Sequence, residues 1–113
     1  ADDEPVVVAA ALDALAWLGD ESVPEAAARA LDDEDDEVFQ AGLRAAGTLP
    51  TREAEAFLAR GLGHASWNVR MLAIKLLLEL GTAEARRLLK NAENDESDSM
   101  VRHAIEIGLR PGG

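Results

Sequence analysis

The chain has 113 residues, of which 48% are apolar, so we expect one folded domain rather than a disordered segment. Its net charge of -11 argues against nucleic-acid binding, because an acidic surface repels phosphates. It has no Cys, which excludes disulfides, thiolate metal sites and a Cys nucleophile and is consistent with a cytoplasmic location. No apolar run approaches the roughly 20 residues that span a bilayer, so we expect no membrane segment.

The chain begins with the acidic segment 1–4 and with Ala1 in place of Met. An acidic start is atypical of a signal peptide, so none is expected. The missing Met indicates processing or excision from a longer chain.

A repeat of 31 or 32 residues runs through the sequence. Four valines mark it, at Val7, Val38, Val69 and Val101. A Gly or Pro stands twelve residues after each valine, at Gly19, Pro50, Gly81 and Gly113. A polar residue stands three before each valine, at Glu4, Asp35, Ser66 and Asp98. Each unit is therefore predicted to be a helix, a tight turn and a second helix.

The recurring residues predict the helix boundaries. Asp35, Ser66 and Asp98 are expected to cap the first helix of their units, because short polar side chains accept from the free N–H groups of a first turn. Pro5 and Pro24 suit first turns, where a missing N–H is tolerated. We expect three residues to cap the second helices: Asp20, Thr51 and Thr82. In chain order the predicted helices are 5–18, 21–31, 36–49, 52–62, 67–80, 83–92 and 99–109.

Leucine, valine and alanine recur on one side of these helices at i, i+3, i+4 and i+7, as in the predicted helix 67–80. One hairpin cannot bury such a face alone, so the units must stack. The sequence therefore predicts one all-α domain, residues 1–113, with units 4–34, 35–65, 66–97 and a final helix 98–113. This is an α-solenoid of about three and a half hairpins, expected to form a right-handed stack. Leu76 is placed in the middle of the third unit, and Leu76→Ala is expected to destabilise by roughly 2–5 kcal/mol.

Three strings resemble a known family: Leu18-Gly19-Asp20-Glu21-Ser22-Val23-Pro24, Ser66-Trp67-Asn68-Val69-Arg70 and Asp98-Ser99-Met100-Val101-Arg102. They are similar to the short HEAT-like repeat of phycobilin lyase subunits and of many prokaryotic proteins. In that family the Arg after Val ties neighbouring repeats together through an acidic partner. The resemblance implies this role for Arg70 and Arg102 and leaves it in doubt for the first half, where Val8 and Phe39 stand instead. The final unit stops after one helix, as a terminal cap or a truncation would.

The sequence shows no recognisable catalytic motif, so we expect no enzyme and no cofactor. His64 and His103 form no His-Glu pair and are expected to be surface histidines. The acidic run 32–37 is interpreted as a solvated loop between repeats; the alternative, a Ca²⁺ site, lacks the Gly of a calcium loop. Gly61-Leu62-Gly63-His64 matches no phosphate-binding pattern.

The second helices of a solenoid line its concave side, which is an extended binding surface. Their exposed positions combine small Ala residues with cations, so we expect the chain to bind a protein segment, and the cations favour an acidic one. We expect the chain to be a monomer. The candidate contact residues are Arg29, Arg60, Arg86, Arg87, Lys90, Trp17 and Trp67. The two Trp residues are interpreted either as binding hot spots or as covers for seams between repeats. The alternative function is a subunit of a bilin-lyase-like enzyme that needs a partner to complete its site.

Overall fold

The computed structural model describes residues 4–111, and this part of the chain consists of helices joined by short turns. Its seven helices in chain order are α1 (Pro5–Leu18), α2 (Val23–Ala30), α3 (Asp36–Ala46), α4 (Thr51–Gly61), α5 (Trp67–Leu80), α6 (Ala83–Asp95) and α7 (Ser99–Gly108). The predicted all-α repeat fold is confirmed.

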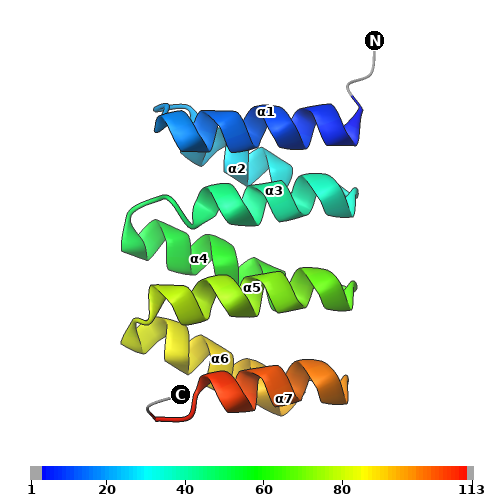
Figure 1. Cartoon of the computed structure of the whole chain (residues 1–113), viewed down its shortest axis with the longest axis vertical. Coiled ribbons are helices and arrows are strands. Elements are labelled where there is room, and N and C mark those ends of the chain that lie inside the picture. The colour runs from blue at the N-terminus through cyan, green and yellow to red at the C-terminus, as the bar shows by residue number, and fades with distance from the viewer. Residues whose placement is uncertain (1–3, 112–113) are drawn as a thin grey trace.

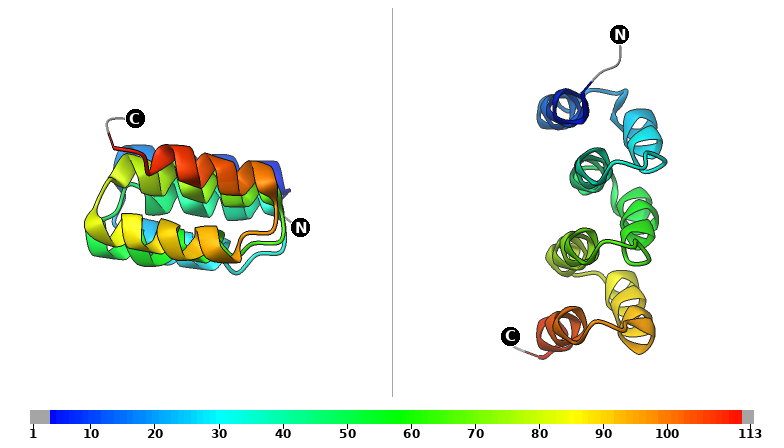
Figure 2. Two further views of the ribbon diagram at one scale, coloured as in Figure 1. Left: turned by 90° about the horizontal axis from the view of Figure 1, so that it is seen from below. Right: turned by 90° about the vertical axis from the view of Figure 1, so that its right-hand side faces the viewer.

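The helices form two layers along one stacking axis (Figure 1). The first layer holds α1, α3, α5 and α7, and the second holds α2, α4 and α6, as the end-on columns in Figure 2 show. The Cα atoms extend over 45 Å along the stack and 26 Å by 18 Å across it. Each helix of the first layer packs on the helix before it in the same layer, so the stack grows one hairpin at a time.

Glycines and acidic caps end and begin several helices as predicted. Gly19 and Gly81 adopt φ of 68° and 66°, the left-handed conformation that ends a helix at little steric cost to Gly. The side chain of Asp35 accepts hydrogen bonds from two first-turn amides of α3, and Asp98 does the same for α7. Thr82 caps α6 by accepting from the amide of Ala85.

Two predicted caps, Asp20 and Thr51, are wrong, and a third, Ser66, occupies the predicted cap position without the expected side-chain hydrogen bond. Ser66 precedes α5 without capping it through its side chain, because its hydroxyl donates instead to the carboxylate of Asp36 in the preceding repeat. Asp20 lies before the α2 cap and holds the turn by accepting from the amide and hydroxyl of Ser22, at 2.8 and 2.7 Å. Thr51 is already the first residue of α4, and Pro50 occupies the cap position.

Two helices end away from their predicted positions. α3 was expected to reach residue 49 and ends at Ala46. Gly47 follows, and the Thr48 hydroxyl donates to the carbonyl of Ala45, so the chain turns before the extended Pro50. Helical backbone is also disfavoured at the residue that precedes a Pro. α6 runs to Asp95, three residues beyond its predicted end.

The buried core contains the same repeat position in successive units. Val38, Val69 and Val101 are all buried, as their matching positions require. Val7 occupies the same position in the first unit and is 57% exposed. Burial at this position comes from the preceding hairpin, and no described element lies on that side of α1.

Small residues let neighbouring helices approach closely. A Cβ placed on Gly61 at the end of α4 would lie 2.7 Å from the Cβ of Ala73 in α5 and 3.0 Å from Leu43. Such a distance is too short for two carbon atoms, so α4 and α5 need Gly at this crossing.

Candidate functional site

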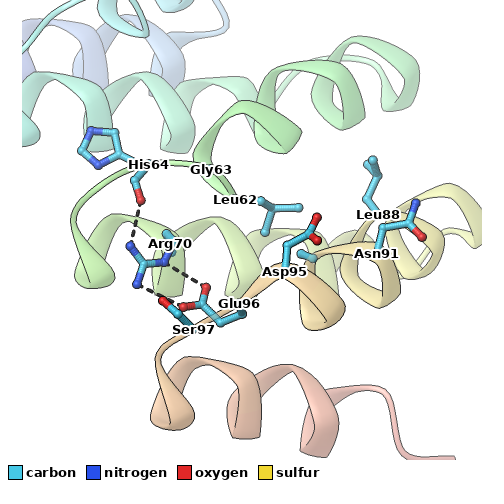
Figure 3. Close-up of a pocket in the computed structure, with 10 residues that line it drawn as sticks. Leu62, Gly63, His64, Arg70, Leu88, Asn91, Asp95, Glu96 and Ser97 are labelled. Carbon is cyan, nitrogen blue, oxygen red and sulfur yellow. Dashed lines mark hydrogen bonds and ion pairs between the residues drawn. The ribbon is translucent and has the colours of Figure 1, made fainter.

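The strongest polar cluster lies between the third unit and the final helix (Figure 3). Arg70 in α5 donates to both carboxylate oxygens of Glu96, at 2.9 and 3.1 Å, and to the carbonyls of His64 and Ala65, at 2.8 and 2.9 Å. The two charged side chains are only 15% and 7% exposed. Glu96 also accepts from the amide of Asp98 at 3.0 Å, so the pair joins α5 to the start of α7.

A cleft of about 400 Å³ opens beside this pair, between the loop that follows α4 and the C-terminal half of α6. Leu62 and Leu88 form its apolar wall, and Asn91 and Asp95 lie on its α6 side in Figure 3. The polar groups of the Arg70–Glu96 pair are already satisfied by each other and by backbone atoms. The Arg70–Glu96 ion pair itself lies within the third unit, and its hydrogen bonds to backbone atoms of His64, Ala65 and Asp98 join that unit to both of its neighbours. The cluster therefore connects repeats, as the resemblance implies for the Arg after Val.

Arg102 is the counterpart of Arg70 one repeat later, and it behaves differently. Its side chain is exposed and makes no hydrogen bond or ion pair with any described residue. The tie implied by the resemblance is thus present at one Val-Arg pair and absent, among residues 4–111, at the other.

Two further ion pairs join repeats in the first half of the chain, where the resemblance left such ties in doubt. Arg44 in α3 donates through two nitrogens to Asp13 in α1, at 3.0 and 3.1 Å. Arg60 in α4 donates to the Asp32 carboxylate at 2.7 Å and to the Leu31 carbonyl at 3.0 Å. The signal for the first pair was present in the sequence, since opposite charges stand one repeat apart at residues 13 and 44.

His64 was expected on the surface, and that prediction is wrong. Its side chain is 17% exposed, and its ring centroid lies 4.5 Å from that of Phe39, which stands in the first helix of the same unit. Its Nδ1 accepts from the amide of Ser66 at 3.0 Å. The His64 side chain therefore lies at the junction of the second and third units, between Phe39 and the start of α5. His103, by contrast, is exposed as predicted.

The candidate cations of the second-helix layer fall into two groups. Arg86, Arg87 and Lys90 are all exposed and lie within five residues of α6. Arg87 donates to Glu84 at 2.7 and 2.6 Å, and these bonds lower the pKa of the Glu84 carboxyl and raise the pKa of the guanidinium. Arg86 donates to the carbonyl of Leu109, which joins α6 to the end of α7.

Arg29 and Arg60 do not share the surface of the α6 cations. Arg60 is engaged with Asp32 and Leu31, as described above. Arg29 is exposed beside α1, where it lines a groove of about 510 Å³ at the first end of the stack.

The two Trp side chains do not cover seams between the described repeats. Trp17 is 88% exposed at the end of α1, and Trp67 is 62% exposed at the start of α5. Their interpretation as seam covers is therefore wrong, and the interpretation as contact residues remains a prediction.

The acidic run 32–37 serves the repeat boundary. Asp33 accepts from the amide of Asp35 at 2.8 Å, Asp35 caps α3, and Asp36 accepts from Ser66. Within residues 4–111 no group of three or more His, Cys, Asp or Glu side chains is arranged to hold a metal ion. The part of the chain that the structure describes likewise contains no helix that is long and apolar enough to cross a membrane.

Comparison with known proteins agrees with this architecture. No curated protein matches the chain. The family model described as HEAT repeats matches residues 23–110, which is more than half of the sequence and takes in α2 to α7. This chain therefore belongs to the HEAT-repeat family.

Proposed function

We propose that this chain is a non-catalytic protein-binding module that holds an acidic segment of a partner protein against α6 in its second-helix layer. HEAT repeats commonly mediate contacts between proteins, and their stacked helices present an extended surface. The observation that carries the proposal is the exposed set Arg86, Arg87 and Lys90 on one helix of a chain whose net charge is -11.

The charge contrast gives this surface its selectivity. Among the residues of α6 near the three cations, Glu84 pairs with Arg87, while Lys90 forms no ion pair within residues 4–111. The three cations of α6 are balanced by Glu84, Glu93 and Asp95, so this helix has no net charge within a chain of -11. An acidic segment is therefore repelled less here than elsewhere, which favours docking beside the three cations. Arg87 can exchange its exposed pair with Glu84 for a partner carboxylate at small cost, because exposed ion pairs contribute little stability.

The contacts that the candidate cations already make favour fewer partner-binding residues than the sequence suggested. Arg60 is a poor candidate, because its removal would break the contacts with Asp32 and Leu31 between the first two units. Arg29 lies at the end of the stack. We therefore assign the acidic partner to Arg86, Arg87 and Lys90, and we leave Trp67 as an aromatic contact on the first-helix layer.

The test compares two charge reversals of equal size. Arg87→Glu/Lys90→Glu changes α6, and Lys75→Glu/Arg102→Glu makes the same change in net charge at exposed positions of the first-helix layer. Each protein, checked for equal helicity by circular dichroism, serves as bait in a lysate of the source organism.

We expect the wild type and the Lys75→Glu/Arg102→Glu control to capture the same partner, the α6 variant to lose it, and capture to weaken as salt is raised. Equal capture by all three baits would show that α6 is not the docking surface. Equal loss from both variants would show that only overall charge matters.

The alternative function, a subunit of a bilin-lyase-like enzyme, rests on the resemblance of the sequence strings alone. Neither the matched family nor any contact among residues 4–111 adds to it, so we do not propose it. The cytoplasmic location remains a prediction that cell fractionation would test.

A further inference from the structure

Helix α1 is apolar around almost its whole circumference. Asp13 is its only charged residue, and that carboxylate is taken up by Arg44 in α3. A helix that is apolar on all sides is normally buried on all sides. Yet among residues 4–111 α1 packs mainly on α2 and α3, and it lies at one end of the stack in Figure 1.

The side of α1 that faces away from the stack forms a continuous exposed stripe. It consists of residues spaced by four, three and four positions: Val7, Ala11, Ala14 and Leu18. Val7 is 57% exposed and Leu18 is 74% exposed. Trp17 and Val6, also exposed, lie along one edge of the stripe, and the groove lined by Ala26 and Arg29 of α2 lies along the other.

In the later units the corresponding face packs on the preceding hairpin. The positions that match Val7 in the later units are Val38, Val69 and Val101, and each is buried against the hairpin before it. The end of α1 therefore presents a packing face of the repeat, uncovered by any described residue. An outer face of a solenoid that stays in contact with water is usually polar, and this face of α1 is not.

The opposite end of the stack has a more polar outer face than α1. Residues of α5 that pack toward α7 include Met71, Ile74 and Leu78. The positions 32 residues later are His103 and Glu106 in α7 and Arg110 just after it, and all three are exposed. The apolar side chains of Met100 and Ile107 in α7 are exposed as well. A head-to-tail contact would place these polar groups on the apolar stripe of α1, which leaves them without partners and is unfavourable.

The stripe matches a second copy of itself. Two antiparallel α1 helices place Val7 of one copy opposite Leu18 of the other and Ala11 opposite Ala14, because each pair of residue numbers adds to 25. Large side chains then meet at both ends, and the alanines at the centre let the helices approach. The same arrangement brings Trp17 within about one helical turn of Val6 in the other copy.

Charge favours the antiparallel over the parallel arrangement. The N-terminal end of α1 lies beside the acidic residues 34–37, and Glu4 lines the same surface as they do. A parallel pair would bring two such clusters together, whereas an antiparallel pair holds them at opposite ends and opposes the two helix dipoles. The groove carries one cation, Arg29, and one anion, Asp33, so it adds no net charge to the contact.

From these observations we propose that the chain forms a two-fold symmetric dimer through its α1 end face, with the two α1 helices antiparallel. A self-complementary patch is what such a dimer requires. The cross-section of the whole stack, 26 Å by 18 Å between Cα atoms, sets an upper limit of about 1,000 Å² buried over both copies, near the lower limit of specific interfaces. We therefore expect a weak and reversible dimer, whose Kd the buried area alone does not set. The sequence alone had suggested a monomer.

Sedimentation equilibrium over a range of concentrations tests the dimer. We expect the wild type to approach twice the mass of one chain near 100 µM, and more completely at higher salt, because salt screens repulsion between the acidic copies. Ala14→Glu places a charge at the centre of the stripe and should raise Kd at least about tenfold, since an unpaired charge is costly to bury. The matched control is Ala56→Glu, the same change at an exposed helical position of α4, which should leave Kd unchanged.

Cross-linking tests the orientation, and the absence of native Cys makes single-Cys variants unambiguous. A mixture of Val7→Cys and Leu18→Cys should form mixed disulfides on mild oxidation. Val7→Cys alone should not, because in an antiparallel pair the two copies of residue 7 lie about 16 Å apart.

A folded wild type that remains monomeric at 100 µM would overturn the proposal. Equal weakening by Ala14→Glu and Ala56→Glu would also do so, and efficient cross-linking of Val7→Cys to itself would replace the antiparallel arrangement by a parallel one. None of these outcomes affects partner capture by α6, which weakens with salt while the dimer strengthens.

Discussion

The Arg70–Glu96 pair offers the sharpest test of how the repeats are held together. Arg70→Met removes the guanidinium and keeps an apolar stem of similar length. It removes two hydrogen bonds to Glu96 and two to backbone carbonyls, and leaves a carboxylate that is 7% exposed without its cation. Breaking a buried ion pair by removing one partner typically costs about 3–5 kcal/mol.

We expect Arg70→Met to lower the free energy of unfolding by about 3 kcal/mol, the lower part of that range, because the guanidinium keeps some contact with water. The matched control is Arg102→Met, the same change at the other Val-Arg string. Arg102 is exposed and unpaired within residues 4–111, so its replacement should change the free energy by less than about 0.5 kcal/mol.

Urea denaturation followed by circular dichroism at 222 nm measures both values. Total stabilities of domains are about 5–15 kcal/mol, so a loss of 3 kcal/mol shifts the midpoint clearly. The double variant Arg70→Met/Glu96→Gln should lose about 1–3 kcal/mol less than the sum of its single changes, because the two residues contact each other. Similar losses for Arg70→Met and Arg102→Met, or additive losses in the double variant, would refute the role of this pair.

Three further predictions follow from the packing and the turns. Leu77 is fully buried and Leu76 only partly, so the structure corrects the position expected for Leu76 from the sequence. Leu77→Ala should lower the unfolding free energy by about 2–5 kcal/mol, and Leu76→Ala by clearly less than the value expected from the sequence. Urea titrations measure both, and the reverse order would mean that α5 is rotated. Gly61→Ala should destabilise by about 1–3 kcal/mol through its clash with α5, and a stabilised variant would contradict the close crossing. The hydroxyl and amide of Ser22 lower the pKa of Asp20, so this turn contributes stability above the carboxyl's unfolded pKa and loses it as pH falls through the lower folded value. Ser22→Ala should therefore raise the pKa of Asp20 in an NMR titration, and an unchanged value would refute the hydroxyl contact.

Local sequence signals predicted the helix pattern well. The spans 5–18 and 67–80 match α1 and α5, because Gly19 and Gly81 end both helices by a conformation that depends on the residue type itself. Asp35, Thr82 and Asp98 were predicted as caps for the same local reason: their partners lie two or three residues away.

The sequence did not predict the contacts between residues far apart in the chain. The Ser66 hydroxyl could cap α5 or bond elsewhere, and it was the position of Asp36 in the folded stack that decided between them. His64 was predicted to be exposed because it forms no His-Glu pair, and Phe39, its ring neighbour, lies 25 residues away in the sequence. Spacing indicated which residues recur, but it did not show which of several acids each Arg would reach.

By itself, then, the sequence determined the repeat, the helices and the side of each helix that is apolar, because these depend on propensity and on spacing within a few residues. Only the tertiary structure decided burial and pairing, because both depend on which hairpin lies next to a given position. Val7 and Val38 occupy the same place in their repeats, yet one is 57% exposed and the other 3%. The difference is the neighbouring unit that covers Val38, and for this reason the candidate dimer face on α1 could not be recognised before the stack was seen.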